Sequence, residues 1–387
     1  METKYTLSND TWGAEERDAV ETVLNEKFFT MGKAVEQAEK EAAKAFGRQY
    51  SVMVNSGSSA NLLAIAAMVQ AGRLQPGDEI LVPAVSWGTT YFPIEQLGLR
   101  MRLVDIDKET LNMDLAKAEE AITENTRAIF AVNLLGNPND FSKLEKICRD
   151  HDLILMEDNC ESMGAKYNGR QAGSFGVFGT YSTFFSHHLC TMEGGFVATD
   201  DKELYEYMLS TRAHGWTRNL PEENMIYNKS PNSFYDSFCF VLPGYNLRPL
   251  EMEGAIFLEQ IKKLNRLVAQ RRENAALFME KIGTDERFML QKETGESSWF
   301  GFSMVLREPD VQLRDRVVSK LVENGIETRP IVAGNFARQP VFGKLHATVS
   351  GELVNADYIH DNGFFVGNHS VEMEEEISYL KEVLEKI

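Results

Sequence analysis

The sequence predicts an α/β fold built on a mainly parallel sheet, and two observations support this prediction. Short apolar runs rich in β-branched residues alternate with helix-like stretches through the first two-thirds of the chain. Such alternation is typical of parallel strands that helices cover on both faces. A long helical stretch then leads into a smaller set of elements. We therefore predict a large domain over residues 12–248 and a smaller C-terminal α/β domain over residues 249–387, with residues 1–11 packed against the smaller one.

The individual elements follow from these patterns in chain order. Strands are expected at 50–54, 79–83, 100–106, 128–134, 153–157 and 195–199. Helices are expected at 62–69, 113–123, 140–151, 250–282 and 373–387, and the segments 299–306 and 312–324 lie between the last two of these helices. A polar, proline-containing stretch at 221–238 breaks the alternation and predicts a long loop, a kind of segment that is often functional. In a sheet of this class, ligands bind beyond the carboxyl ends of the strands.

Charge and cysteine usage exclude several classes of protein. The chain has 387 residues, with 58 acidic against 40 basic side chains and a net charge of −18, which argues against nucleic-acid binding. The amino-terminal residues lack a signal-peptide pattern, and no apolar run in the first third is long enough to span a membrane. Four cysteines are spread along the chain without a CxxC pair, so neither a metal site nor a redox motif is indicated. We expect a cytoplasmic protein without membrane association.

A Gly/Ser turn follows the first expected strand. Residues 55–61 read Asn-Ser-Gly-Ser-Ser-Ala-Asn and lead into an expected helix. Free N–H groups at a helix start favour a phosphate, Gly57 lets the backbone come close to it, and Ser58 adds a hydroxyl. A capped helix after a glycine turn has the same pattern, so this turn alone does not identify a phosphate site.

Asp158 comes directly after the apolar run at 153–157. The end of a buried parallel strand is the place where such a sheet presents side chains to a ligand. A carboxylate at this place could face the pyridine nitrogen of a pyridoxal cofactor, whose protonated ring serves as an electron sink. The alternative is that Asp158 only caps a helix or a turn.

Residues 181–195 resemble a known family most strongly. They read Tyr-Ser-Thr-Phe-Phe-Ser-His-His-Leu-Cys-Thr-Met-Glu-Gly-Gly and are similar to the DegT/DnrJ/EryC1/StrS family of nucleotide-sugar aminotransferases. In that family a Ser precedes the lysine that binds the cofactor, and a Gly-Glu-Gly-Gly stretch follows it. Here Ser182 holds the Ser position, His187 stands at the lysine position and Met192 replaces the first Gly. No lysine occurs between 167 and 201, so no shift of register restores one.

Four further motifs resemble the same family in the same order along the chain. They are residues 56–60 (a phosphate turn like SGTxA), 83–87 (a segment that carries a ring-stacking aromatic residue), 157–161 (like EDxxQ) and 244–248 (like GYNxR). In the second motif Trp87 would be the stacking residue, with a core tryptophan as the alternative. Glu161 replaces the Gln of the third, and it would lie over the ring or be a solvated helix residue. Asn246 would reach the cofactor phosphate of the neighbouring subunit.

The resemblance implies an aspartate-aminotransferase-like large domain, fold type I among enzymes that use pyridoxal phosphate (PLP). It implies that the chain binds PLP, or its amino form pyridoxamine phosphate (PMP), without a covalent bond. The residues that would bind it are Gly57, Ser58, Trp87, Asp158, Glu161, Ser182 and Asn246. Since Asn246 would act in the neighbour's site, the resemblance also implies a homodimer with shared active sites.

A histidine at the lysine position, within Ser-His-His, resembles the 3-dehydratase branch of the family. The most similar part of that branch acts on a GDP-linked 4-keto-6-deoxy sugar in colitose and O-antigen biosynthesis. The resemblance implies removal of the C3 hydroxyl, with glutamate converting PLP to PMP and with ammonia released. His187 would move the proton at the cofactor C4′ atom, for which an ordinary pKa near ~6.5 is suitable. The wide spacing of the cysteines argues against the iron–sulfur sub-branch, and no metal is expected.

Four arginines and a histidine are candidates for substrate binding. Arg218, Arg248 and Arg329, together with Arg212, could pair with a pyrophosphate or with the carboxylates of glutamate, because guanidinium binds both in a bidentate way. His214 could contact the sugar. Each of these residues alone is more commonly a surface or structural residue.

Two other functions remain open at this stage. The first is a nucleotide-sugar aminotransferase, against which the missing lysine counts. The second is an inactive relative that binds the cofactor or a nucleotide sugar for regulation. Retention of Asp158, Ser58, Ser182 and Asn246 beside His187 argues against the second.

Overall fold

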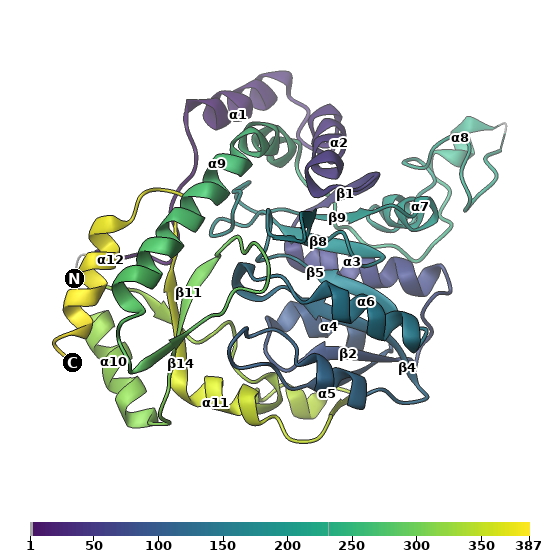
Figure 1. Cartoon of the computed structure of the whole chain (residues 1–387). Coiled ribbons are helices and arrows are strands. Elements are labelled where there is room, and N and C mark those ends of the chain that lie inside the picture. Colours follow the sequence, from purple (N-terminus) through teal and green to yellow (C-terminus); the bar gives the residue numbers. More distant parts are fainter. Residues whose placement is uncertain (1–2, 231) are drawn as a thin grey trace.

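The computed structural model describes residues 3–230 and 232–387, and an eight-stranded sheet forms its centre (Figure 1). The strands follow the spatial order β1-β9-β8-β5-β4-β2-β3-β13. They are β1 (Tyr50–Val54), β2 (Glu79–Pro83), β3 (Arg100–Val104), β4 (Thr126–Val132), β5 (Ile154–Asp158), β8 (Phe178–Ser182), β9 (Gly195–Thr199) and β13 (Ala347–Val349). In the described part of the chain, β9 pairs with β1 and β8 in antiparallel fashion, and the other pairs of this sheet are parallel. The predicted mainly parallel sheet is therefore confirmed.

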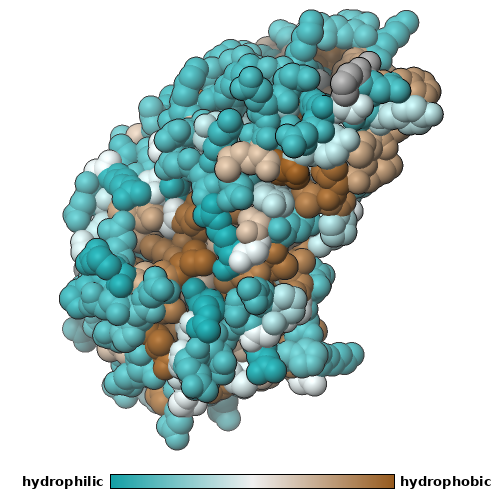
Figure 2. All heavy atoms as spheres, turned by 90° about the vertical axis from the view of Figure 1, so that its right-hand side faces the viewer, coloured by the Kyte–Doolittle hydropathy of each residue, from teal (hydrophilic) through white to brown (hydrophobic). Residues whose placement is uncertain are grey.

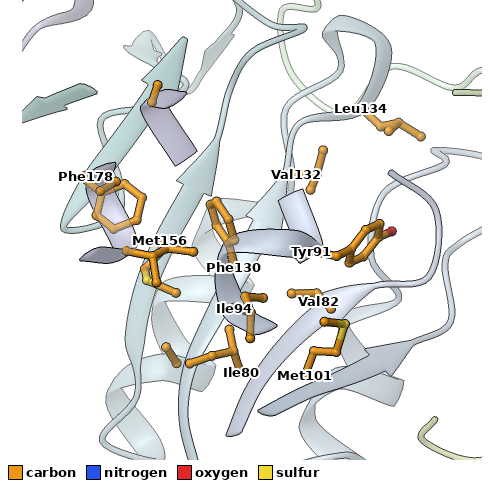
Figure 3. Close-up of a cluster of buried hydrophobic side chains, with 14 of the residues drawn as sticks. Ile80, Val82, Tyr91, Ile94, Met101, Phe130, Val132, Leu134, Met156 and Phe178 are labelled. Atoms are coloured by element: carbon orange, nitrogen blue, oxygen red, sulfur yellow. The ribbon is translucent and has the colours of Figure 1, made fainter. Parts of the chain in front are cut away.

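Helices cover both faces of this sheet, as predicted. They are α3 (Gly57–Gln70), α4 (Gly88–Gln96) and α7 (Lys202–Thr211) on one face, and α5 (Leu115–Glu120) and α6 (Phe141–Asp150) on the other. Successive side chains of a strand point to opposite faces. Ile80 and Val82 of β2 thus join the cluster that contains α3 and α4 (Figure 3), whereas Leu81 joins the cluster beneath α6.

The C-terminal third forms a second, four-stranded antiparallel sheet in the order β10-β11-β14-β12. Its strands are β10 (Phe288–Leu290), β11 (Gly301–Leu306), β12 (Thr328–Arg329) and β14 (Gly363–Gly367), accompanied by α9 (Glu251–Ile282), α10 (Val311–Glu323), α11 (Val354–Asn362) and α12 (Glu374–Leu384). Tyr5 pairs with Ile326 and donates its hydroxyl to the carbonyl of Gly367 at 2.6 Å. The amino-terminal segment therefore contacts this sheet, although residues 1–2 lie outside the described residues. The domain boundary at 248/249 stays a prediction.

The remaining elements are short or flank the sheets. They are α1 (Ala14–Glu26), α2 (Lys33–Phe46), α8 (Ser233–Asp236), β6 (Lys166–Tyr167), β7 (Arg170–Gln171), η1 (Leu134–Gly136), η2 (Phe336–Arg338) and η3 (Phe342–Lys344). The predicted loop at 221–238 is mostly irregular and contains α8, and it projects from the body of the molecule (Figure 1); its residue 231 lies outside the described residues. No helix in the described part of the chain is both long and apolar enough to span a membrane.

Candidate active site

A cavity of about 340 Å³ lies at the carboxyl ends of the central parallel strands. Its walls come from the start of α3, the end of β2, the end of β5, the β8–β9 connection and the second sheet. The predicted site residues that line it are Gly57, Ser58, Trp87, Asp158, Glu161, Ser182, His187 and Arg329. The cavity does not include Asn246, His214, Arg218 or Arg248. Residues far apart in sequence therefore meet where the topology predicted a ligand.

The start of α3 forms one wall and offers free backbone donors. Ser56 caps the helix, and its hydroxyl oxygen accepts from the N–H of Ser59 at 3.0 Å. The helix begins at Gly57, earlier than the predicted 62–69, so the expected Gly/Ser turn is the first helical turn. The N–H groups of Gly57 and Ser58 have no hydrogen-bond acceptor among the described residues. This helix start is suited to an anionic phosphate.

Gly57 is required at its position by close packing rather than by its backbone angles. A Cβ atom there would lie 2.6 Å from the Cβ of Ser182 and 3.1 Å from the Sγ of Cys160. Ser182 ends β8, and its hydroxyl oxygen accepts from the N–H of Phe184 at 3.2 Å. Because Gly57 has no side chain, the start of α3 can lie close to the ends of β8 and β5 beside the cavity.

Asp158 is the last residue of β5, and three hydrogen-bond donors hold its carboxylate in place. One oxygen accepts from the amide of Asn61 at 2.8 Å and from the hydroxyl of Thr90 at 2.7 Å, and the other accepts from the N–H of Cys160 at 3.1 Å. Its neighbour Glu157 points to the opposite side of the sheet, where it accepts backbone N–H groups at 2.6 Å. The strand alternation thus assigns Asp158 to the cavity and excludes a simple helix cap.

His187 lies in the connection between β8 and β9, and internal hydrogen bonds shape this connection. The hydroxyl groups of Thr183 and Thr191 are 2.5 Å apart, and the N–H of Thr191 donates to the carbonyl of Thr183 at 2.9 Å. The N–H of His187 donates to the carbonyl of Phe184 at 2.9 Å. The closed connection therefore presents the imidazole to the cavity in a fixed place.

The imidazole of His187 is neutral in this environment. Burial, followed by the positive charge of Arg271, lowers the pKa of His187 to about 3. Its Nδ1 atom is buried and has no hydrogen-bond partner among the described residues. The expectation of an ordinary pKa near ~6.5 is therefore wrong for this structure, because the ring is removed from water and faces a cation. A neutral imidazole retains the lone pair that accepts a proton.

His188 points away from the cavity into the protein interior. It is fully buried, and its Nε2 atom lies 3.1 Å from the carbonyl oxygen of Ser298. Burial also lowers the pKa of His188 well below the usual value. Its position fits the structural reading, in which it anchors the loop that presents His187.

Glu161 faces the cavity and is not a solvated helix residue. Its carboxylate accepts from the N–H of Leu135 at 3.0 Å. Burial raises the pKa of Glu161 to about 7, an effect that this hydrogen bond opposes and the charge of Asp158 reinforces. Near neutral pH the carboxyl group is therefore present in both its protonated and its charged form. A glutamine at this position would not titrate.

Trp87 and Arg329 stand at the mouth of the cavity. Trp87 is 58% exposed, so the alternative of a core tryptophan is wrong. Arg329 is exposed in β12, and no carboxylate of the described part of the chain forms an ion pair with it. An indole face and an available guanidinium suit a flat ring and an anionic group respectively.

Met192 occupies the position where the family has glycine, and its backbone explains that preference. Its φ angle is +72°, in the left-handed region that glycine adopts without cost. The side chain is 41% exposed. The substitution therefore preserves the turn and places the strained residue where its side chain meets solvent.

The four predicted residues outside the cavity gather in a second place, close to the projecting loop. The Arg218 guanidinium lies 5.3 Å from the centre of the Trp216 ring, and that of Arg248 lies 6.0 Å from it. The His214 ring is 4.7 Å from Trp216, and Arg248 donates to the Asn246 side chain at 2.9 Å. The predicted role of Arg212 is wrong, because it is buried against Glu39.

Sequence reasoning missed Asn61, Thr90, Phe300 and the cavity position of Cys160. Asn61 lies four residues after Gly57, one helical turn on and on the same face, so the helical period could have found it. Thr90 and Phe300 are brought in by tertiary packing and gave no local signal. Within the described residues, no group of three or more histidine, cysteine, aspartate or glutamate side chains is placed to bind a metal ion.

The residues of the cavity fit a pyridoxal phosphate. The free N–H groups of α3 suit its phosphate, the Asp158 carboxylate suits its ring nitrogen, and the Gly57 position leaves room that a side chain would fill. Among the described residues that line the cavity there is no lysine. The site therefore suits a cofactor that is held by hydrogen bonds and stacking.

Comparison with known proteins agrees with this geometry. The sequence pattern of the DegT/DnrJ/EryC1/StrS aminotransferase family matches residues 10–386. A GDP-4-keto-6-deoxy-D-mannose 3-dehydratase from Yersinia pseudotuberculosis is 54% identical over 386 residues, which are 99% of this chain and 98% of that protein.

Two solved structures are similar to the whole fold. The E. coli GDP-4-keto-6-deoxy-D-mannose-3-dehydratase with bound hydrated PLP has a TM-score of 0.97 and 52% identity, over 99% of this chain and 100% of that one. A GDP-4-keto-6-deoxymannose-3-dehydratase with a trapped PLP–glutamate geminal diamine has a TM-score of 0.96 and 52% identity, over 98% and 100% of the two chains. Their similarity supports the aspartate-aminotransferase-like fold that the resemblance implied.

Proposed function

The chain belongs to the DegT/DnrJ/EryC1/StrS aminotransferase family, and from that membership we propose that it is a GDP-4-keto-6-deoxymannose 3-dehydratase. The reaction removes the C3 hydroxyl of the sugar with PLP and PMP as cofactor, and it belongs to colitose and O-antigen biosynthesis. The observation that carries the proposal is His187, which lines the cavity at the position of the family's lysine. The full-length similarity to 3-dehydratases supports it.

The cavity residues bind and orient the cofactor. When bound, PMP would supply the amino group that condenses with the C4 ketone, and the ring of the cofactor would store electrons. The start of α3, with Gly57 and Ser58, binds the phosphate, and Ser182 lies beside it. Asp158 faces the ring nitrogen, held in place by Asn61 and Thr90.

Two further side chains that line the cavity would contact the cofactor ring. Trp87 would stack on one face of the ring, and Glu161 would lie beside it. Because Glu161 titrates near neutral pH, it can donate or accept a hydrogen bond toward the ring. These contacts hold the cofactor in the absence of a covalent bond to the chain.

His187 moves the proton at the C4′ atom of the cofactor. Its buried imidazole is neutral and has a lone pair available, which is what a proton acceptor requires. The same ring, once protonated, can donate toward the leaving C3 hydroxyl. Since no amine of the chain recaptures the product, water releases it as a 3-deoxy-4-keto sugar with ammonia.

The arginines bind the anionic groups of the two substrates. Arg329, exposed at the cavity mouth, binds a carboxylate of glutamate when PLP is converted to PMP. Arg218 and Arg248 lie outside the chain's own cavity beside Trp216. We assign these two arginines and His214 to the GDP-sugar in the site of a neighbouring subunit.

A homodimer follows from this assignment. Figure 2 shows hydrophobic atoms across the hollowed middle of the face that carries the projecting loop. The exposed large apolar and aromatic side chains of the described residues include Phe28, Phe29, Trp87, Phe234, Tyr235, Phe238, Phe240 and Leu250. Patches of this kind usually mark a protein interface. A second copy of the chain would cover them and would bring Asn246 to the neighbour's cofactor phosphate.

We place the enzyme in the cytoplasm. Its four cysteines, Cys148, Cys160, Cys190 and Cys239, are all unpaired. Unpaired cysteines are typical of a reducing compartment, in which disulfides do not persist.

The decisive experiment supplies PLP, glutamate and GDP-4-keto-6-deoxymannose to the purified protein and follows ammonia and product mass together. Ammonia release with loss of the C3 oxygen establishes the dehydratase. An aminated sugar without ammonia would instead establish an aminotransferase. If neither product forms and PLP is not converted to PMP, the protein is an inactive relative that binds the cofactor or a sugar.

A further inference from the structure

Arg271 of α9 is a buried cation without an acidic partner. It is 4% exposed, and no carboxylate of the described residues forms an ion pair with it. Its guanidinium donates instead to the hydroxyl of Ser370 at 3.0 Å and to the carbonyl of Asn368 at 2.6 Å. Burial lowers the pKa of Arg271 to about 10, so the residue is still charged at neutral pH. Burial of an unpaired charge costs free energy of folding, so we expect Arg271 to have a role that explains why it is there.

The same guanidinium also binds the turn at Trp299 and Phe300. It donates to the Phe300 carbonyl at 3.1 Å and to the Trp299 carbonyl at 3.4 Å. Asn368, whose amide also donates to the carbonyl of Arg271 at 3.0 Å, donates to Trp299 at 2.8 Å. Arg271 and Asn368 therefore hold one turn from its inner side.

The turn is strained and needs such support. Trp299 has a φ angle of +49°, which is unfavourable for a bulky residue. Its indole is buried in the core of the second sheet. The N–H of Phe300 donates to the carbonyl of Leu135 at 3.0 Å, so the turn is also fixed to the large sheet.

Phe300 connects the turn to the catalytic imidazole. Its ring centre is 5.0 Å from that of His187 in an edge-to-face arrangement at 62°. Both residues line the cavity. Movement of the turn would therefore change the place of the imidazole.

We propose that Arg271 is a positioning residue for His187. Its guanidinium holds the Trp299–Phe300 turn against the imidazole, and its positive charge adds to the burial that already favours a neutral imidazole. The proposal rests on the proposed function of His187 as the group that moves the C4′ proton. It explains why an unpaired cation is kept in the interior: the charge disfavours a second positive charge on the ring.

Other charged or titratable groups line the same cavity as this imidazole or lie next to it in the chain. They are Asp158, Cys160, Glu161, Glu193 and Arg329 around the cavity, and His188 behind it. The three carboxyl groups favour a charged imidazole, whereas Arg271 opposes it. Arg272 is next to Arg271 on α9, but it pairs with Glu296 at 3.6 Å and donates to the Ser297 carbonyl at 2.8 Å.

The test separates charge from hydrogen bonding with two variants. Arg271→Gln keeps an amide donor for the turn and removes the charge, whereas Arg271→Lys keeps the charge and loses the fork of donors. Carbon-13-labelled histidine in the full-length protein, with and without PLP, allows the His187 resonance to be titrated by NMR from pH 8 down to about pH 2, a range that includes the midpoint expected for the unsubstituted protein, near pH 3. The His187→Asn variant assigns that resonance, and Arg272→Gln is the matched control.

We expect Arg271→Gln to raise the titration midpoint of His187 by about one pH unit. Arg271→Lys and Arg272→Gln should leave the midpoint where it is in the unsubstituted protein. In dehydration assays, Arg271→Lys should lower kcat at least about tenfold with KM little changed, because the turn is no longer held. The acid limb of the pH profile should move upward in Arg271→Gln alone.

Coincident titration curves for Arg271→Gln and Arg272→Gln would overturn the electrostatic part of the proposal. Unchanged kcat in Arg271→Lys would overturn the positioning part. The NMR result does not depend on turnover. If the unsubstituted protein fails to dehydrate the sugar, the proposed function fails while the effect of Arg271 on His187 is still measured.

Discussion

The exchange of lysine for histidine changes what one position of the cavity can do. A lysine amine can bond covalently to the cofactor and recapture it after each cycle. An imidazole can only hold and move a proton. His187 is buried, neutral and fixed by its loop, which fits that narrower role.

Replacement of His187 should therefore separate chemistry from cofactor binding. We expect His187→Asn to lower kcat for dehydration by roughly 10²–10⁴-fold, because a proton-transfer group is lost. PLP binding, followed by absorbance, should change little. We expect His187→Lys to trap the cofactor covalently, seen as a mass increase after borohydride reduction, and to suppress dehydration. The exposed His346 provides the control; equal loss of activity in His346→Asn would contradict the assignment.

Glu161 should make the stability of the protein depend on pH. Burial raises its pKa to about 7 from an ordinary 4.5. The folded state thus keeps a proton that the unfolded chain releases above about pH 4.5. This stabilising contribution is complete below that pH and is lost as the pH rises through 7.

Glu161→Gln should remove this dependence. Between pH 5 and 8 we expect the variant to gain roughly 1–3 kcal/mol in free energy of unfolding relative to the unsubstituted protein. Thermal unfolding at several pH values measures this difference. Glu119→Gln, at an exposed position of α5, is the control and should give parallel curves. Parallel curves for Glu161→Gln as well would mean that the carboxyl group is not desolvated.

At the scale of the element, α3 depends on close contact at its first residue. A side chain at position 57 would collide with Ser182 and Cys160. We expect Gly57→Ala to weaken PLP binding at least about tenfold and to cost about 1–3 kcal/mol of stability. Fluorescence titration with PLP and thermal unfolding measure the two effects. Gly343→Ala, where nothing lies within 4 Å, should be neutral; an unaffected Gly57→Ala would show that the helix start can move.

The sequence predicted the strands whose patterns are local. The runs at 50–54, 79–83 and 195–199 match β1, β2 and β9, because buried strands bounded by turns are readable from composition. It missed β8, whose residues include Gly179 and the small polar side chains Thr180 and Ser182. The strand forms because both its neighbours pair with it, and that is tertiary information.

The site was predictable to the extent that its motifs are local. The five motifs placed Gly57, Trp87, Asp158 and His187 in one cavity. The support behind them was not predictable, because Arg271 and the turn at 299–300 reach the site only through the packing of the second sheet against the first.

At the scale of the whole molecule, shared sites make a distinct prediction. If Asn246 acts in the neighbour's cavity, a mixture of His187→Asn and Asn246→Ala chains, unfolded and refolded together, contains dimers with one intact site. We expect recovery of up to about a quarter of the normal activity. Each variant refolded alone should be nearly inactive.

The control for this mixture is a pair that damages the same cavity. His187→Asn mixed with Asp158→Asn leaves no intact site in any dimer and should recover nothing. Recovery in this control, or none in the first mixture, would contradict the shared site. Light scattering after size-exclusion chromatography checks that both mixtures contain dimers.

The strand β13 has a consequence for synthesis on the ribosome. It pairs Ala347 with Met101 at the far edge of the large sheet, so the last piece of that sheet is translated after most of the second one. Until then β3 presents an open edge with unpaired backbone groups, which invites association with other nascent chains. The last strand of the large sheet is therefore supplied by the C-terminal part of the chain. A chain that stalls before residue 349 is left with an unpaired β3 edge, which the finished protein never exposes.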